Sequence, residues 1–297
     1  MLSKIIEDFK PYIRTYLFSE DSIKECLRYI KNFNDYFNLM KFADLKQVEY
    51  NHLLNFTTGG DIGPSTIKAR TWALNFFYAF LKLYDHVEYN IAADLPKVKV
   101  PKKEADFLTT DELVLIFNHL AAKTKEVYGL RNLLIFALMA ILGLRRKSVS
   151  ELNVEDVDLK FNQIYAREKG MWGKRAIPVP LVVSDIMNEY ISENKLTRGA
   201  LFPSKRGTRL RPDAVNKILR NVKNEIFEDD RAKAKLPAKI NPHLFRHSAA
   251  TQLNEVAGFA VTRDVLGHRR DNNAKDYIHL SPSSFGQLMK EHPFHSI

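Results

Sequence analysis

The chain has 297 residues, a formal net charge of +10 and a pI near 9.4. No apolar run is long enough to span a membrane, and the single cysteine, Cys26, excludes an internal disulfide framework. The N-terminus lacks the pattern of a signal peptide, so we expect an intracellular, cytoplasmic protein with no membrane partner. The charge favours a polyanionic partner, most often nucleic acid, although a basic protein without such a partner is the alternative.

The elements predicted in chain order are mostly helices. Residues 21–40 and 63–84 carry apolar side chains at helical spacing, so residues 1–95 are interpreted as a helical domain. Two prolines and four lysines lie within 96–103, which predicts a basic linker over 96–106. Helices resume at Thr109 or Thr110, and the almost wholly apolar segment 131–144 predicts a helix buried on all sides. Residues 162–180 break the helical period and predict a hairpin. The fold class is therefore mainly α with a small antiparallel β-sheet.

The segment 241–253, NPHLFRHSAATQL, predicts the start of a helix with a cluster of polar side chains. Asn241 is a suitable N-cap and Pro242 a suitable first residue. His243, Arg246 and His247 then fall on one side of the helix. A zinc site is disfavoured, since Leu244 stands where a metalloprotease has its glutamate and no other ligand cluster exists. An inert helix start and a phosphate-contacting His–Arg pair remain, and we favour the second.

Three other segments supply side chains of matching chemistry. Arg145 follows the apolar helix, where its guanidinium either reaches back to solvent or faces a bound anion. Lys169 and Lys174 lie near the predicted hairpin turn, and His268 precedes Tyr277 by nine residues. Residues 198–223 hold eight basic residues and one acid, which is either a solvated face or a surface that follows a DNA backbone.

Taken in order, these segments resemble the tyrosine site-specific recombinase family, the integrase/Xer group. The resemblance covers about residues 107–290 and rests on GLR, the hairpin lysine, HLFRH, LGH and a tyrosine nine residues later. It implies a catalytic domain over 107–297 and, more loosely, a DNA-binding core-binding domain over 1–95. The catalytic residues that it implies are Arg145, Lys169, His243, Arg246, His268 and the nucleophile Tyr277.

The implied reaction is cleavage and rejoining of DNA strands through a 3′-phosphotyrosyl intermediate and a Holliday junction, without metal, ATP or other cofactor. Xer-like resolution of chromosomes or plasmids and integration of mobile elements both fit it. A type IB topoisomerase-like enzyme is a less favoured alternative, and a catalytically silent or partner-dependent DNA-binding accessory protein is another. The implied partners are a double-stranded recombination site and three further copies of the chain, in a homotetramer on two DNA sites. The tail, 281–297, is expected to form a helix that docks on a neighbouring protomer, the alternative being its own domain.

Two departures from the family pattern affect the site residues. Ser148 stands where the family usually has an acidic residue, and Glu151 follows three positions later. Without the usual acidic residue, it is in doubt which side chain holds Arg145 in place. If the register shifts by one residue, Arg146 takes the role instead. The hairpin is also about one residue longer than usual, so Lys174 is a lesser candidate for the role of Lys169. We expect His247 to be structural.

Overall fold

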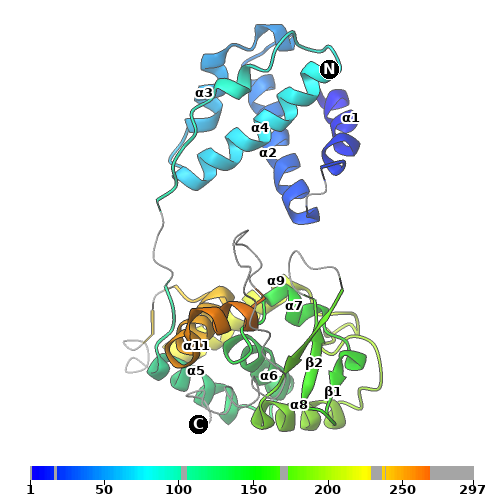
Figure 1. The fold of residues 1–297 in the computed structure, drawn as a ribbon, viewed down its shortest axis with the longest axis vertical. Coiled ribbons are helices and arrows are strands. Elements are labelled where there is room, and N and C mark those ends of the chain that lie inside the picture. The colour runs from blue at the N-terminus through cyan, green and yellow to red at the C-terminus, as the bar shows by residue number, and fades with distance from the viewer. Residues whose placement is uncertain are drawn as a thin grey trace. The chain divides into compact units, whose positions relative to one another are not determined.

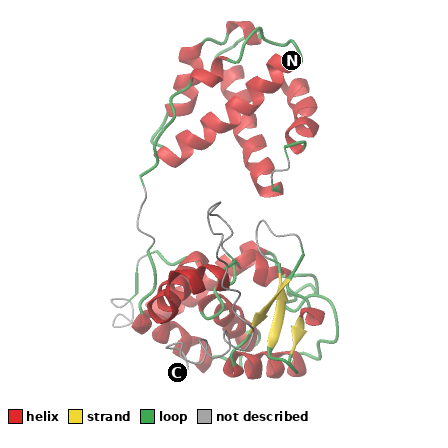
Figure 2. Ribbon diagram, viewed as in Figure 1, coloured by secondary structure: helices red, strands yellow, loops and turns green. Residues whose placement is uncertain are grey.

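The computed structural model describes residues 2–16, 19–101, 106–167, 173–228, 236, 237 and 239–267, with the side chains of 259 and 264 left out. The chain divides into two compact units, Met1–Lys103 and Glu104–Ile297. Figure 1 follows both units along the chain, and the strands drawn in Figure 2 all belong to the described part of the second. None of the described helices is both long and apolar enough to cross a membrane.

The first unit is built from helices. These are α1 (Leu2–Arg14), α2 (Glu20–Leu39), α3 (Tyr50–Thr58) and α4 (Pro64–Leu83), with short 3-10 helices at Leu45–Gln47 and Ile91–Asp94. α2 and α4 pack against each other, and α1 covers both. Aromatic rings fill the centre, where Phe9 meets Phe77 edge-on at 5.2 Å between ring centroids and Phe33 meets Phe56 at 5.3 Å.

The second unit surrounds one apolar helix. α6 (Gly129–Ala140) packs against α5 (Thr110–Ala122), α8 (Leu181–Glu193) and α11 (Pro242–Val265). Every residue of α6 except Asn132 is buried, which confirms the helix predicted to be buried on all sides. The described residues of this unit also form α7 (Arg146–Glu151), a 3-10 turn (Val154–Asp156) and α9 (Pro212–Phe227).

The sheet has three antiparallel strands in the order β1 (Val157–Asp158), β2 (Gln163–Ala166) and β3 (Arg175–Pro178). Ile164 pairs with Ile177, and both side chains are fully buried, so this register directs the apolar face of the hairpin into the core. The predicted hairpin and the fold class, mainly α with a small antiparallel sheet, are confirmed.

Two features fix α11, which carries the HLFRH segment. Its start is stabilised by Asn241, whose Oδ1 accepts the backbone N–H of His243 at 2.9 Å, as a capping residue does. Ser248 is fully buried, and its Oγ accepts the N–H of Leu108 at 2.7 Å and donates to the carbonyl of Leu244 at 2.9 Å.

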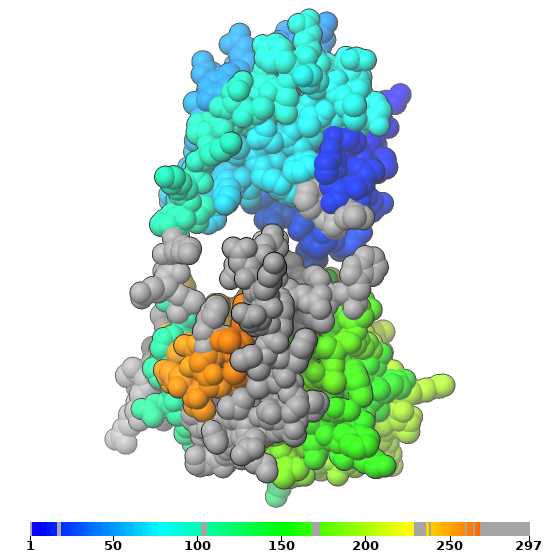
Figure 3. Space-filling view, in the orientation of Figure 1, coloured from blue at the N-terminus to red at the C-terminus, as the bar shows by residue number. Residues whose placement is uncertain are grey.

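The helix is interrupted at Gly258, where φ is 78° and ψ is 170°. The part of α11 near its C-terminus, orange in Figure 3, lies at the surface.

Candidate active site

Arg246 connects three of the segments that the sequence singled out. The residue is only 5% exposed, and its guanidinium donates to the carbonyl of Gly143 and, at 2.7 Å, to that of Leu266. Gly143 precedes Arg145 by two residues, and Leu266 precedes His268 by two. The GLR segment, about 100 residues before HLFRH, and the LGH segment, about 20 residues after it, therefore meet around one buried side chain.

Gly143 is held in a conformation that suits glycine. Its φ is +61°, and a Cβ added there would lie 2.2 Å from Cδ2 of the buried Leu266. The absence of a side chain thus lets the turn after α6 approach the turn after α11. This close approach brings the Gly143 and Leu266 carbonyls within reach of the same guanidinium.

Arg145 and Arg146 occupy different positions at the start of α7. Arg145 is the N-cap residue, with extended backbone and a half-buried side chain. Arg146 is the first residue of the helix, and its guanidinium lies 3.6 Å from the carboxylate of Asp213 on α9. Arg146 therefore has an acidic neighbour on another helix, and part of its charge is compensated there.

The two histidines of α11 lie close together at the surface. Their ring centroids are 6.2 Å apart, and both residues are exposed. The pKa of His243 is lowered, first by partial burial and then by the positive charges of His247, Arg246, Arg146 and Arg145. At neutral pH the imidazole of His243 is therefore uncharged and can accept a proton. His247 is exposed, and the structural role expected for it stays a prediction.

Lys174 has a partner that argues against its candidacy as a catalytic lysine. Its ammonium forms an ion pair with Oδ1 of Asp156, whose side chain is 7% exposed, and Asp156 Oδ2 accepts the N–H of Asn153 at 2.9 Å. This pair joins the start of β3 to the turn that follows α7. Ser148, which is buried, and Glu151 line a polar cavity of about 260 Å³ together with both members of the pair.

Sequence reasoning missed two arginines that hold this region together. Arg175 of β3 donates to the carbonyl of Val265, next to the residue that Arg246 contacts. Arg209 donates to the carbonyls of Ser150 and Leu152, both at 2.9 Å. Arg209 belongs to the basic run 198–223, so at least one of those charges serves the fold. No sequence signal distinguishes it from the other basic residues of that run.

Three of the six predicted site residues, Lys169, His268 and Tyr277, lie outside the described residues, as does the tail 281–297. Of the other three, the structure places Arg246 and His243 on α11 and Arg145 at the start of α7. Among the described residues, no group of three or more His, Cys, Asp or Glu side chains is placed to hold a metal ion. The HxxxH pair has no third such ligand there.

A family model and a curated relative both match most of the chain. Residues 106–284 match the model of the phage integrase family. Tyrosine recombinase XerC of Halalkalibacterium halodurans is 28% identical over 279 residues, which cover 90% of this chain and 88% of the relative.

Two solved structures share the fold. XerH site-specific recombinase bound to difH substrate, in a pre-cleavage complex, superposes with a TM-score of 0.70 at 18% identity, covering 99% of this chain and 94% of that one. A lambda integrase tetramer bound to a Holliday junction gives 0.70 at 16% identity, covering 94% and 80%.

Proposed function

Because this chain belongs to the phage integrase family and is a site-specific recombinase that cleaves and rejoins DNA strands, we propose how its residues divide the reaction. Tyr277 is the nucleophile. Its hydroxyl oxygen forms a bond to the scissile phosphorus, while the bond from phosphorus to the 5′-oxygen breaks. The products are a 3′-phosphotyrosyl link and a free 5′-hydroxyl, so a 5′-hydroxyl can reverse the step.

The observation that carries this proposal is the position of Arg246. Two carbonyls, those of Gly143 and Leu266, fix the plane of its guanidinium before any DNA binds. A fixed guanidinium can neutralise charge on the non-bridging phosphate oxygens without reorganising during the reaction. Arg145, two residues beyond Gly143, is the second arginine of the pair. Loss of one such donor typically raises the barrier by about 3–4 kcal/mol.

Proton transfer is assigned to the remaining residues. A tyrosine hydroxyl has an ordinary pKa of about 10, so Tyr277 needs a proton acceptor at neutral pH. The lowered pKa of His243 keeps it neutral and suits it to that role. Lys169 donates the proton to the leaving 5′-oxygen, and His268 donates a hydrogen bond to the phosphate. The ion pair of Lys174 with Asp156 favours Lys169 over Lys174. No step calls on a metal or ATP.

The two units divide the DNA contacts. Residues 1–95 form the core-binding domain, 96–106 the linker and 107–297 the catalytic domain, a division compatible with the separate cores of the two units. The partner is a double-stranded recombination site, by analogy with XerH bound to difH substrate. The assembly is a homotetramer, by analogy with the lambda integrase tetramer bound to a Holliday junction. The tail docks on a neighbouring protomer. The enzyme works in the cytoplasm, where its DNA substrate lies.

Covalent trapping tests the proposal. The full chain is incubated with sheared DNA from its own source and denatured, and the DNA that stays attached to protein is sequenced. Wild type should yield adducts at one discrete sequence, and Tyr277→Phe should yield none. Adducts that persist in Tyr277→Phe would refute the assigned nucleophile. DNA binding without adducts in either protein would instead indicate a non-catalytic or partner-dependent role.

Arg246→Lys tests whether the fixed orientation of the Arg246 guanidinium, and not its charge alone, is needed for cleavage. Lysine keeps the positive charge but cannot donate to both carbonyls in a planar fork. We expect its yield of adducts to fall about 100-fold or more, while nonspecific DNA binding stays within twofold. An unchanged yield would show that charge alone, and not the fixed orientation, matters at this position.

A further inference from the structure

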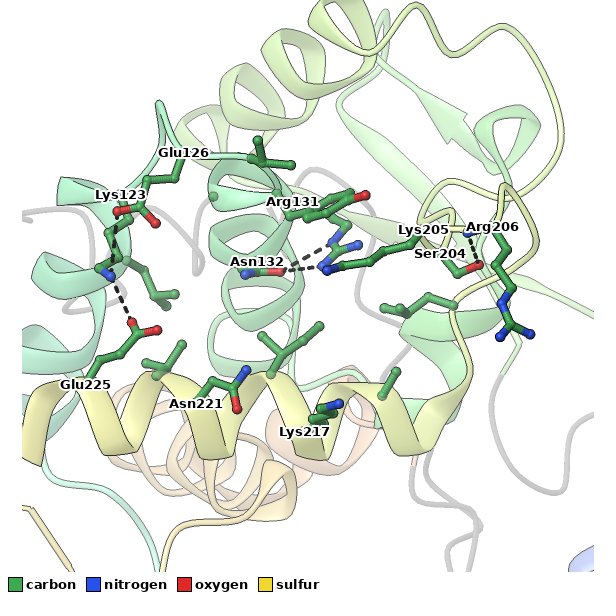
Figure 4. A pocket seen from close by; sticks show the side chains of 18 residues that line it. Lys123, Glu126, Arg131, Asn132, Ser204, Lys205, Arg206, Lys217, Asn221 and Glu225 are labelled. Atoms are coloured by element: carbon green, nitrogen blue, oxygen red, sulfur yellow. Dashed lines mark hydrogen bonds and ion pairs between the residues drawn. The ribbon is translucent and has the colours of Figure 1, made fainter.

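A second cavity lies in the catalytic unit and shares no lining residue with the site described above. It occupies about 560 Å³ between the end of α5, the start of α6, the turn at 204–206 and one face of α9 (Figure 4). Its volume falls within the range of pockets that hold small molecules.

Two acidic side chains lie at one end of this cavity, beside basic neighbours. Lys123 lies 3.0 Å from the carboxylate of Glu225 and 3.6 Å from that of Glu126. His119 contacts Glu225 as well, at 2.9 Å. The two acidic residues that line the cavity are thus both engaged by neighbouring basic side chains, as the dashed lines at Lys123 in Figure 4 show.

The other end centres on a buried cation that lacks an acidic partner. Arg131 is 7% exposed and contacts neutral groups: Oδ1 of Asn132 at 3.0 Å, the carbonyl of Pro203 at 3.4 Å and the ring of Tyr128 at 4.2 Å. Within the described part of the chain, no carboxylate contacts it. Burial lowers its pKa, which reflects the cost of keeping this charge away from water.

Further positive charge converges on the same end. Lys205 also lies over the Tyr128 ring, at 5.9 Å, and Arg206 and Lys217 line the cavity beside it. None of these three forms an ion pair with the described residues. The N-terminus of α6, which has no side-chain cap, adds the positive end of a helix dipole. The charge at this end therefore exceeds what the fold itself compensates.

The shape of the cavity favours a small ligand over a DNA strand. Leu210, Ile218 and Val222 give it apolar walls, and Asn221 offers a polar group between them. A DNA backbone running through the cavity would bring its phosphates against Glu126 and Glu225. A ligand with phosphate at one end only avoids that repulsion and places its remaining atoms on the apolar walls.

We propose that this cavity binds a small phosphorylated molecule, with its phosphate or diphosphate group held by Arg131, Lys205 and Lys217. Such a ligand would contact the 204–206 turn and α9, both of which are connected to α7. Arg209, just beyond the 204–206 turn, donates to carbonyls of Ser150 and Leu152, and α9 meets α7 through Asp213 and Arg146. The site is therefore placed to regulate the segment that follows Arg145.

The test uses isothermal titration calorimetry of the full chain with two probes, inorganic pyrophosphate and adenosine triphosphate, in the absence of DNA. Wild type should bind at least one probe at a single site. The pair Lys205→Gln and Lys217→Gln should weaken this binding at least tenfold. The pair Lys160→Gln and Arg220→Gln removes two charges outside the cavity, and it should change the dissociation constant less than twofold.

Three outcomes overturn the proposal. The first is no binding of either probe by wild type at millimolar concentration. The second is equal weakening by both pairs of substitutions, which would reveal a general attraction to positive charge. The third is that the Lys205/Lys217 pair weakens binding of a short nonspecific duplex by the same factor as binding of the probes, which would make the cavity a DNA contact. Since the readout is binding, the result does not depend on recombinase activity.

Discussion

Because the turns at Gly143 and Leu266 approach each other closely, replacing Gly143 by alanine should lower the free energy of unfolding more than the same change at an open glycine. Gly143→Ala places a residue with a Cβ at φ +61°, where non-glycine residues are disfavoured by about 1–2 kcal/mol. The new Cβ would also lie 2.2 Å from Cδ2 of Leu266, which is 1% exposed and has little room to move. Overpacking of this kind costs about 1–3 kcal/mol. The expected total is about 2–5 kcal/mol of unfolding free energy.

Gly207→Ala is the matched control. Gly207 has φ +75°, but nothing lies within 4 Å of the position of its added Cβ. It should cost only the backbone term, about 1–2 kcal/mol. The difference between the two variants, about 1–3 kcal/mol, therefore measures the crowding against Leu266.

Urea unfolding followed by circular dichroism gives both free energies, and thermal unfolding gives an independent comparison. Each kcal/mol should lower the melting temperature of a unit of this size by about 2–4 °C. In a Leu266→Ala background the excess cost of Gly143→Ala should largely disappear, because the clashing methyl group is gone. Equal costs for Gly143→Ala and Gly207→Ala, or an excess that survives Leu266→Ala, would refute the close approach on which the site geometry rests.

Three further predictions address neighbouring contacts. His247→Gln removes a positive neighbour of His243, so the pKa of His243 should rise towards its ordinary value. The acid limb of the pH–cleavage profile should then move to higher pH. A limb that stays in place or moves to lower pH would contradict the influence of His247 on His243. Lys174→Met should destabilise the catalytic unit by about 1–3 kcal/mol in urea, because it leaves the buried carboxylate of Asp156 without its cation, and adding Asp156→Asn should restore part of the loss. Ser248→Ala removes the acceptor of a buried backbone N–H before α5 and should cost about 1–3 kcal/mol, visible as faster hydrogen exchange at that amide; unchanged exchange would count against the bond.

Local sequence determined much of the architecture. The apolar run in 131–144 can be satisfied only by burial on every side, and α6 is buried in that way. The alternation of apolar and polar residues in 162–180 predicted the hairpin, and Asn241-Pro242 predicted the start of α11. Both features depend on residues that are close in sequence. The family was indicated by five motifs in order, namely GLR, the hairpin lysine, HLFRH, LGH and the tyrosine nine residues later. The roles of Lys169, His268 and Tyr277 stay predictions.

Other features arose only from tertiary contacts. Nothing in the sequence shows that Lys174 pairs with Asp156, that Arg209 serves the fold, or that the Arg246 guanidinium joins the turns after α6 and α11. The cationic end of the second cavity likewise combines residues from α6, the 204–206 turn and α9. The sequence by itself determined which elements form and which residues carry reactive groups, because these depend on periodicity, caps and residue type. Only the tertiary structure decided which charges are compensated and which converge, because partners 18 to 103 residues apart meet only when the chain has folded.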